Sequence, residues 1–303
     1  MSKISTITIG ATKAEGGTRS YNIKIGGEEA LPGLFKEGAL PNKPRIAFEV
    51  WDTLPLDWPA GLSAEYGKAL NDPLLWAEKC AKKFKADSIC LRLQGTHPDY
   101  ANKSLEEAAG LIKEMLKKIS LPLIIVGSGD DEKDASLLPA CAETTKGERC
   151  LIGSATQENY KTIALSTLAN GHSLIAESPI DVNIAKQLNI LISDTGMPLD
   201  KIAINPTIGA LGYGLEYAYS IMERARLAAL SGDKTLASPF VCFVGQEAWR
   251  AKEAKVEDSN QGIMWEVLTA TALIQAGADL LIMRHPKAIE KVSKYIDNLY
   301  NGE

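Results

Sequence analysis

The chain has 303 residues, of which 45% are hydrophobic and 23% charged, and its net charge is −5 at pH 7. This composition is typical of a soluble globular protein with one large or two small domains, and the acidic balance without a basic, aromatic-bearing stripe argues against nucleic-acid binding. No apolar run reaches the ~18 residues of a membrane span, and MSKISTITIG lacks a signal-peptide pattern, so we expect a cytoplasmic protein.

The first predicted element is a β-hairpin within residues 1–43. TITIGAT and YNIKIGG alternate apolar with polar residues, and the glycine-rich stretch EGGTR lies between them as the turn. We expect this hairpin to be an extension that covers the amino end of a larger domain, residues 44–303.

Eight short apolar segments follow, separated by segments with helical periodicity. The predicted strands are rich in Ile, Val or Leu, as expected for a parallel sheet that is buried on both faces. They span 44–50, 88–94, 121–127, 149–155, 173–178, 201–206, 239–245 and 280–285. The predicted helices span 73–85, 104–118, 134–145, 159–170, 181–195, 215–231, 262–276 and 287–300.

Eight strand–helix units in about 260 residues predict an α/β fold of the (β/α)₈ TIM-barrel class. A doubly wound open sheet is the alternative, but no G-x-G-x-x-G follows the first strand.

In a barrel, the loops that follow the strands carry function. Here these loops are rich in amides, hydroxyls and small residues, as in Gln94-Gly95-Thr96-His97, Ser154-Ala155-Thr156-Gln157, Asn205-Pro206-Thr207 and Gly245-Gln246-Glu247. The seventh loop is predicted to be long, from Gln246 to about Asn260.

Several common barrel chemistries lack their residues in this sequence. An aldolase needs a lysine near the carboxyl end of a strand, and Lys201 begins its strand instead. GQEAW and RHPKA, after the last two strands, do not resemble a phosphate loop. Of three histidines, His172 precedes its strand, so a catalytic zinc site is disfavoured. The five cysteines form no CxxC pair, which disfavours an iron–sulfur cluster or structural zinc in this chain.

Charged residues are predicted inside the barrel. Alternation along the first strand turns Glu49 toward the axis, and the same parity turns Arg92 and Arg284 inward, with Glu177 as a further candidate. The first strand lies between the second and the eighth, so Glu49 is expected between the two arginines. We expect an ion network at the barrel mouth. Glu49 as a general acid or base is the disfavoured alternative, because arginine lowers its pKa.

Three stretches of the sequence together resemble one known family. They are FEVWDTLPLDWP, YNIKIGGEEALP and INPTIGALGYGLEYAYSIMERAR, and FEVWD and NPTIGALGYGLEY are the most specific pieces. The family is the small (delta) subunit of the corrinoid iron–sulfur protein, also called the acetyl-CoA decarbonylase/synthase delta subunit. The resemblance spans essentially the whole chain.

The resemblance implies a (β/α)₈ barrel similar to pterin-binding methyltransferases, paired with a large (gamma) subunit. That subunit would carry a [4Fe–4S] cluster and most contacts to a shared corrinoid (cobalamin), which the small barrel covers. The cobalt would take a methyl group from methyltetrahydrofolate, through a separate methyltetrahydrofolate:corrinoid methyltransferase. It would pass the methyl group to acetyl-CoA synthase in the reductive acetyl-CoA pathway.

The related methyltransferases carry Asp-Pro where this sequence has Asn205-Pro206, and an amide can neither hold a charge nor take a proton near neutrality. We therefore expect a corrinoid-holding subunit with no catalytic residue and no metal ligand of its own. A stand-alone pterin-dependent methyltransferase is the alternative. The predicted corrinoid contacts are short polar residues and loop glycines: Asp52, Thr96, Gln157, Asn205, Thr207, Gly212, Tyr213 and Gln246.

Overall fold

The computed structural model describes residues 2–256 and 259–301, and its centre is a closed barrel of eight parallel strands. The order around the barrel is β10-β3-β4-β5-β6-β7-β8-β9, so the last strand pairs with the first. The strands are β3 (Arg45–Trp51), β4 (Ile89–Arg92), β5 (Leu123–Val126), β6 (Leu151–Ala155), β7 (Ser173–Glu177), β8 (Ile202–Asn205), β9 (Phe240–Cys242) and β10 (Ala278–Met283). The predicted (β/α)₈ barrel is confirmed.

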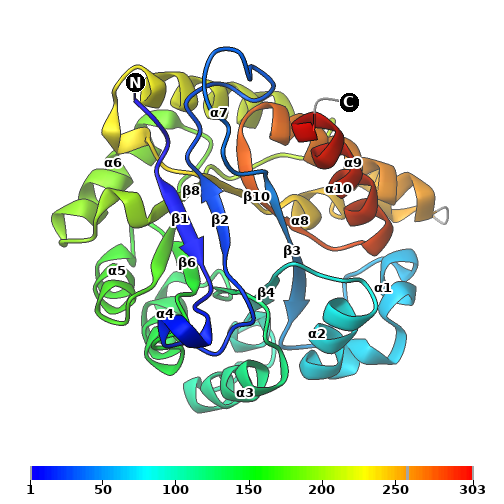
Figure 1. The fold of residues 1–303 in the computed structure, drawn as a ribbon. Helices are drawn as coiled ribbons and strands as arrows, with labels where there is room; N and C mark the ends of the chain where they lie inside the picture. The colour runs from blue at the N-terminus through cyan, green and yellow to red at the C-terminus, as the bar shows by residue number, and fades with distance from the viewer. Residues whose placement is uncertain (1, 257–258, 302–303) are drawn as a thin grey trace.

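Helices surround the strands on the outside (Figure 1). They are α2 (Pro73–Lys82), α3 (Leu105–Lys118), α4 (Asp131–Thr144), α5 (Tyr160–Ala169), α6 (Val182–Asp194), α7 (Leu215–Leu230), α9 (Ser259–Gln275) and α10 (Pro286–Asn301). Carboxylate caps at Asp72, Asp130 and Asp181, and the capping box of Ser104 with Glu107, fix where four of them begin. In residues 2–256 and 259–301 no helix is both long and apolar enough to cross a membrane.

Two short helices at the carboxyl end of the barrel were not predicted: α1 (Ala60–Tyr66) and α8 (Val244–Ala248). The strand predicted at 239–245 was wrong at its end, because β9 stops at Cys242 and α8 follows. Gly245 permits this helix, since a Cβ there would lie 2.6 Å from Cγ of Arg284. Residues 257–258 of the predicted seventh loop, and residues 1 and 302–303 of the predicted domains, lie outside the described residues.

Alternation along the strands divides the buried side chains into two groups. Ile46, Phe48 and Val50 of β3 pack with the helices, in the large outer core. Ala47 instead belongs to a second cluster that fills the barrel axis, together with residues such as Cys90 and Leu280. The inward direction predicted for the alternate residues of the first strand is therefore confirmed.

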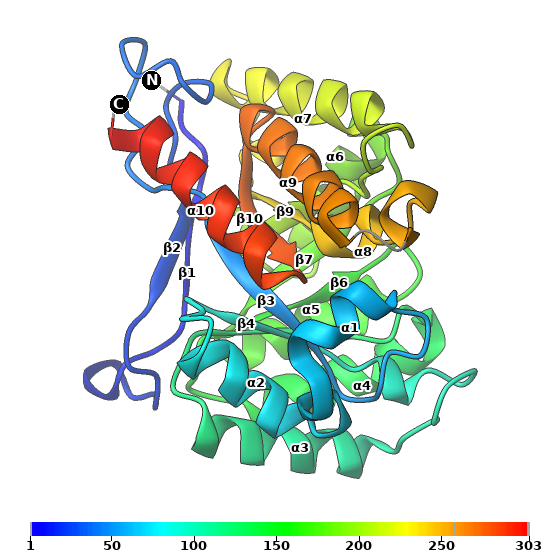
Figure 2. The same cartoon turned by 90° about the vertical axis from the view of Figure 1, so that its right-hand side faces the viewer.

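The hairpin β1 (Thr6–Ile9) and β2 (Ile23–Gly26) pairs antiparallel, as predicted, and lies at the amino end of the barrel. Its side chains Ile7, Ile9, Ile23 and Ile25 belong to the same cluster as the axis-facing residues of the barrel. Figure 2 shows the hairpin at the left, on the side of the barrel away from α1 and α8. The hairpin thus closes one end of the barrel and leaves the other end for a site.

A buried arginine joins the turn of the hairpin to the barrel. Arg19 donates through Nε to Glu148 at 2.9 Å and through its Nη atoms to the backbone carbonyls of Leu116 and Leu121. The side chain of Arg19 is only 1% exposed, so these partners satisfy a charge that would otherwise be costly to bury.

Candidate functional site

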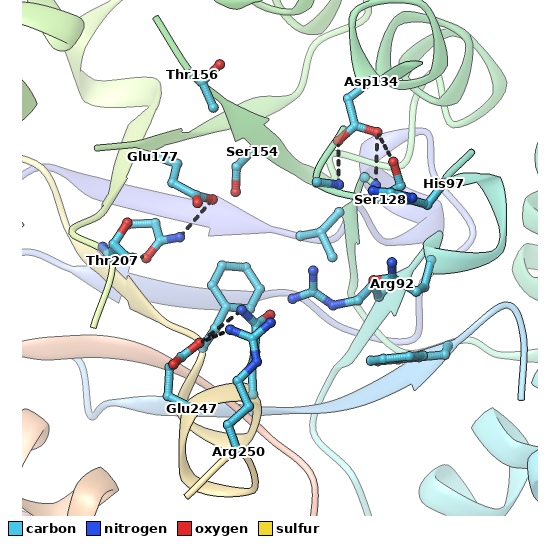
Figure 3. Close-up of a pocket in the computed structure, with 18 of the residues that line it drawn as sticks. Arg92, His97, Ser128, Asp134, Ser154, Thr156, Glu177, Thr207, Glu247 and Arg250 are labelled. Carbon is cyan, nitrogen blue, oxygen red and sulfur yellow. Dashed lines mark hydrogen bonds and ion pairs between the residues drawn. The ribbon is translucent and has the colours of Figure 1, made fainter. Parts of the chain in front are cut away.

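A cavity of about 570 Å³ opens at the carboxyl end of the barrel (Figure 3). All eight strands, or the residues directly after them, contribute to its lining: Trp51, Arg92, Val126, Ser154, Glu177, Asn205, Phe243 and Arg284. This is the end at which (β/α)₈ barrels keep their functional residues, and the volume lies in the range of ligand-binding clefts. The cavity is therefore the candidate functional site.

Glu49 lies at the base of this site between two arginines. Arg92 donates through Nε to Oε1 of Glu49, and Arg284 donates through Nε to Oε2. Burial disfavours the charged carboxylate, but Arg284 and Arg92 outweigh it and lower the pKa of Glu49 to about 2. The predicted ion network is confirmed. With this pKa, Glu49 is a poor proton acceptor near neutrality.

Aromatic rings cover the faces of both guanidinium groups. The Cζ atom of Arg284 lies 5.3 Å from the ring centroid of Trp51 and 4.8 Å from that of Trp58, and Cζ of Arg92 lies 5.0 Å from that of Phe243. Because the Nε atoms of both arginines donate to Glu49, their Nη atoms remain as donors toward the cavity. Figure 3 shows the guanidinium of Arg92 pointing to its middle.

Asp134 forms part of another wall of the cavity. Its Oδ1 accepts from the backbone N–H and the hydroxyl of Ser128, and its Oδ2 accepts from the N–H of Gly129 at 2.9 Å. Burial raises the pKa of Asp134, although these donors oppose the increase. The carboxylate thus fixes the loop after β5. The sequence prediction missed it, because the helix was predicted to begin at Asp134 and begins at Asp131.

Asn205 and Glu177 lie side by side at the ends of β8 and β7. Asn205 donates through Nδ2 to Oε2 of Glu177 at 3.0 Å, and its Oδ1 accepts from the backbone N–H of Thr207 at 3.2 Å. The Thr207 hydroxyl donates to the carbonyl of Ser178 at 2.6 Å. These bonds orient the amide and tie the Asn205-Pro206-Thr207 loop to the neighbouring strand. Glu177, predicted as a further member of the charge network, bonds Asn205 instead.

The loops after β8 and β9 meet at the rim of the cavity. Glu247 accepts from Nε2 of Gln246 at 3.1 Å and from Nη1 of Arg250 at 2.8 Å. Tyr213 donates its hydroxyl to Glu253 at 2.9 Å. Hydrogen bonds thus hold polar side chains of these loops in place, and Glu247 and Arg250 line the cavity although neither is among the eight predicted contacts.

The structure places the eight predicted corrinoid contacts in three different environments. The residues that line the cavity are Asn205, Thr207 and Gln246. The residues that are exposed on the loops outside its lining are Gln157, Gly212 and Tyr213. The residues that are buried beneath the loops are Asp52 and Thr96.

The two buried residues hold backbone rather than face the cavity. Asp52 accepts through Oδ1 from the N–H of Gly95 at 2.6 Å and is paired with Lys103, while Thr96 donates to the carbonyl of Leu93 at 2.7 Å. Both side chains are at most 2% exposed. The composition of the loops could not reveal this, because a short polar side chain suits a backbone partner as well as a ligand.

The site offers hydrogen-bonding groups more readily than a nucleophile or a base. His285 is buried against Trp249, and burial lowers its pKa to about 4. His172 bonds the backbone N–H of Cys150 at the amino end of the barrel, as its position in the sequence predicted. His97 lines the rim of the cavity. Within the described part of the chain, no three His, Cys, Asp or Glu side chains gather as a metal site.

Residues 6–300 match the family model described as CO dehydrogenase/acetyl-CoA synthase delta subunit. The chain is 37% identical over 315 residues to the acetyl-CoA decarbonylase/synthase complex subunit delta of Archaeoglobus fulgidus, covering 99% of this chain and 69% of that protein. It is 33% identical to the subunit of the same name from Methanopyrus kandleri, covering 99% of this chain and 76% of that protein.

Solved structures of dihydropteroate synthases share the fold. The enzyme of Xanthomonas albilineans with 4-aminobenzoic acid aligns with a TM-score of 0.59 at 13% identity, over 88% of this chain and 96% of that one. The enzyme of Thermus thermophilus aligns with a TM-score of 0.57 at 14% identity, over 90% and 99%. At this level of identity the similarity concerns the barrel alone.

Proposed function

Because the chain belongs to the CO dehydrogenase/acetyl-CoA synthase delta subunit family, we propose that it is the small subunit of a corrinoid iron–sulfur methyl carrier. Its partner is a large (gamma) subunit, which holds the [4Fe–4S] cluster and most corrinoid contacts. The pair takes methyl groups from methyltetrahydrofolate through a separate methyltransferase and delivers them to acetyl-CoA synthase in the reductive acetyl-CoA pathway. The relatives' name, a subunit of a decarbonylase/synthase complex, supports this role.

The polar cavity at the carboxyl end of the barrel is the observation that carries the proposal. It presents oriented amides, hydroxyls and guanidinium edges, and its central carboxylate is fixed in the ionised state by Arg284 and Arg92. Such a surface suits a large cofactor whose periphery bears carboxamide groups. When bound, the corrinoid supplies cobalt as the acceptor and donor of the methyl group. The residues of this chain hold the periphery of the ring and exclude water from it.

Within this proposal the predicted contacts have two roles. Asn205, Thr207 and Gln246 face the cofactor from the cavity, and the exposed loop residues Gln157, Gly212 and Tyr213 extend the contact surface around it. Asp52 and Thr96 keep the loops after β3 and β4 in place through the backbone bonds described above. Residues 1–43 serve as an extension that closes the amino end of a barrel domain, residues 44–303.

Co-expression with the large subunit tests the proposal. We expect a stable 1:1 complex in which corrinoid absorbance and iron co-elute with the two chains, in a cytoplasmic extract. The large subunit expressed without this chain should retain corrinoid less well. Failure of the two chains to associate, with both folded and corrinoid supplied, would contradict the function.

A further inference from the structure

We infer that the cavity admits one primary carboxamide side arm of the corrinoid and clamps it between the guanidinium groups of Arg92 and Arg284 on one side and Glu177 on the other. This inference rests on the proposed function and assigns a ligand group to residues that the predicted contacts did not include.

The donor side of the clamp is formed by two guanidinium groups with incomplete hydrogen bonding. Arg92 and Arg284 each bond Glu49 through Nε, and their side chains are only 11% and 5% exposed. In the described part of the chain no hydrogen bond joins their Nη atoms to another residue. The aromatic rings cover the guanidinium faces, so the Nη edges are available to an acceptor oxygen in the cavity.

The acceptor side is the carboxylate of Glu177. One of its oxygens accepts from Asn205, which leaves the other able to accept a hydrogen bond from a ligand. In Figure 3 this carboxylate lies across the cavity from the guanidinium of Arg92. Burial alone would lower the pKa of Arg92, but Glu49 and, more weakly, Glu177 raise it. The charge of Glu177 therefore acts on Arg92 across the cavity.

The balance of charge favours a neutral ligand group with both a donor and an acceptor. Glu49 and Glu177 offset the two positive charges of Arg92 and Arg284. The other charged lining residues are net negative, with one arginine against four carboxylates: Arg250, Asp57, Asp131, Asp134 and Glu247. An added anion would therefore meet no net positive field, whereas a carboxamide can accept from the guanidinium edges and donate to Glu177.

The size of the cavity limits how much of the cofactor enters it. About 570 Å³ has room for an amide side arm and several water molecules, but a whole corrinoid with its substituted macrocycle is larger and must lie over the opening. A single propionamide arm, which is longer than an acetamide arm, can reach from the periphery of the ring into the barrel mouth.

The test compares corrinoids that differ in one amide. The large subunit is loaded with hydroxocobalamin, or with each of its separated monocarboxylic acids in which one propionamide is hydrolysed, and its Kd for the full chain is measured. We expect one monocarboxylic acid to raise the Kd about tenfold or more, because its carboxylate faces Glu177 and has lost the N–H donors. Equal Kd values for all these corrinoids would overturn the inference, while no binding to the hydroxocobalamin-loaded subunit would refute the proposed function instead.

Variants of this chain identify the clamp residues. The diagnostic quantity is the Kd with the discriminating monocarboxylic acid divided by the Kd with hydroxocobalamin. Glu177→Gln should reduce this ratio about tenfold or more, since the neutral amide of the glutamine can donate to the carboxylate of the hydrolysed arm. Glu143→Gln, which changes an exposed residue near the end of α4, is the matched control and should keep the wild-type ratio. Arg92→Lys keeps a charge beside Glu49 but lacks the guanidinium edge, and should weaken binding of the all-amide complex several-fold. An unchanged ratio in Glu177→Gln, with thermal unfolding as in the wild type, would also overturn the inference.

Discussion

Arg284 donates a hydrogen bond to Glu49 across 235 positions of the chain and so links the end of the last barrel strand to the first. Glu49→Ala should remove the carboxylate that both arginines share and leave each of these buried charges without its hydrogen-bonded partner. The expected loss is about 3–5 kcal/mol in the free energy of unfolding, measured by urea denaturation. Glu143→Ala, at an exposed position, should change it by less than about 0.5 kcal/mol. A wild-type urea midpoint for Glu49→Ala would contradict the structural role of the network.

A second buried cluster makes stability depend on pH. Arg226 lies between Asp279, at 2.7 Å, and Glu28, at 3.2 Å, and Asp279 also accepts from the N–H of Phe240. Burial, followed by the charge of Asp279, raises the pKa of Glu28 to about 9, although Arg226 opposes this. We therefore expect Glu28 to hold its proton in the folded chain near neutrality.

The sign of the effect follows from this raised pKa. The contribution of Glu28 to stability is complete below the unfolded pKa of about 4.3 and is lost as the pH rises toward 9, at up to about 1.4 kcal/mol per pH unit. Glu28→Gln mimics the protonated acid and should remove this slope. The pKa of Glu266, which burial raises to about 7, acts in the same direction, so the difference between wild type and Glu28→Gln is the quantity to measure. Parallel stability curves from pH 5 to 9 would exclude Glu28 as the cause.

The repeated strands and helices were predictable from the sequence because each carries its own local signal. Ser104 and Glu107 begin α3 as a capping box, and the apolar segments that became β5 and β7 lie within their predicted ranges. The helices α1 and α8 were not predictable, because each has fewer than ten residues and lies in a loop held by tertiary contacts, such as that of Gly245 with Arg284.

The side chains of the site could be predicted most directly where the alternation of residues along a strand determines their direction. Glu49, Arg92 and Arg284 follow from alternation within strands whose order around the barrel is known. Loop side chains have no such period, so their partners could not be predicted: Asp52 accepts from the backbone of Gly95 in the next loop, and Thr96 donates to the backbone of Leu93 three residues before it. Asp134 was missed because its direction depends on where α4 begins.

The hairpin should be required for a stable barrel. Ile7, Ile9, Ile23 and Ile25 bury the amino end of the axis cluster, so a chain of residues 44–303 would expose that cluster to water. We expect the truncated chain to be largely insoluble, or to bind a hydrophobic dye such as ANS with loss of cooperative thermal unfolding. Arg19→Lys in the full chain is a milder variant and should lower the free energy of unfolding by about 1–3 kcal/mol. A soluble 44–303 chain with wild-type thermal unfolding would show that the extension is dispensable.

The purified single chain should be colourless and contain neither iron nor cobalt. The cysteines are Cys80, Cys90, Cys141, Cys150 and Cys242, and all of them are buried without a CxxC pair. Burial raises the pKa of every one of these thiols, which disfavours the thiolate that ligates metals. Elemental analysis after anaerobic purification is the measurement, with the two-chain complex as the positive control. Stoichiometric iron or cobalt in the single chain would refute this prediction.

Asn205 distinguishes a holding role from a catalytic one. Its amide is already bonded to Glu177 and Thr207, so Asn205→Ala removes neutral or charge-assisted hydrogen bonds worth about 0.5–3 kcal/mol but should leave the fold intact. In a holding role, corrinoid retention or subunit pairing should weaken modestly. Were the amide a donor at a reacting centre, the same change should cost about 10²-fold or more in rate.

The measurement is methyl transfer by the reconstituted two-subunit protein with methyltransferase supplied separately, and Thr207→Val serves as the matched loop variant. Loss of nearly all transfer in Asn205→Ala, with corrinoid still fully bound, would favour the alternative of a pterin-dependent methyltransferase, because only a direct part in the reaction separates rate from binding in this way.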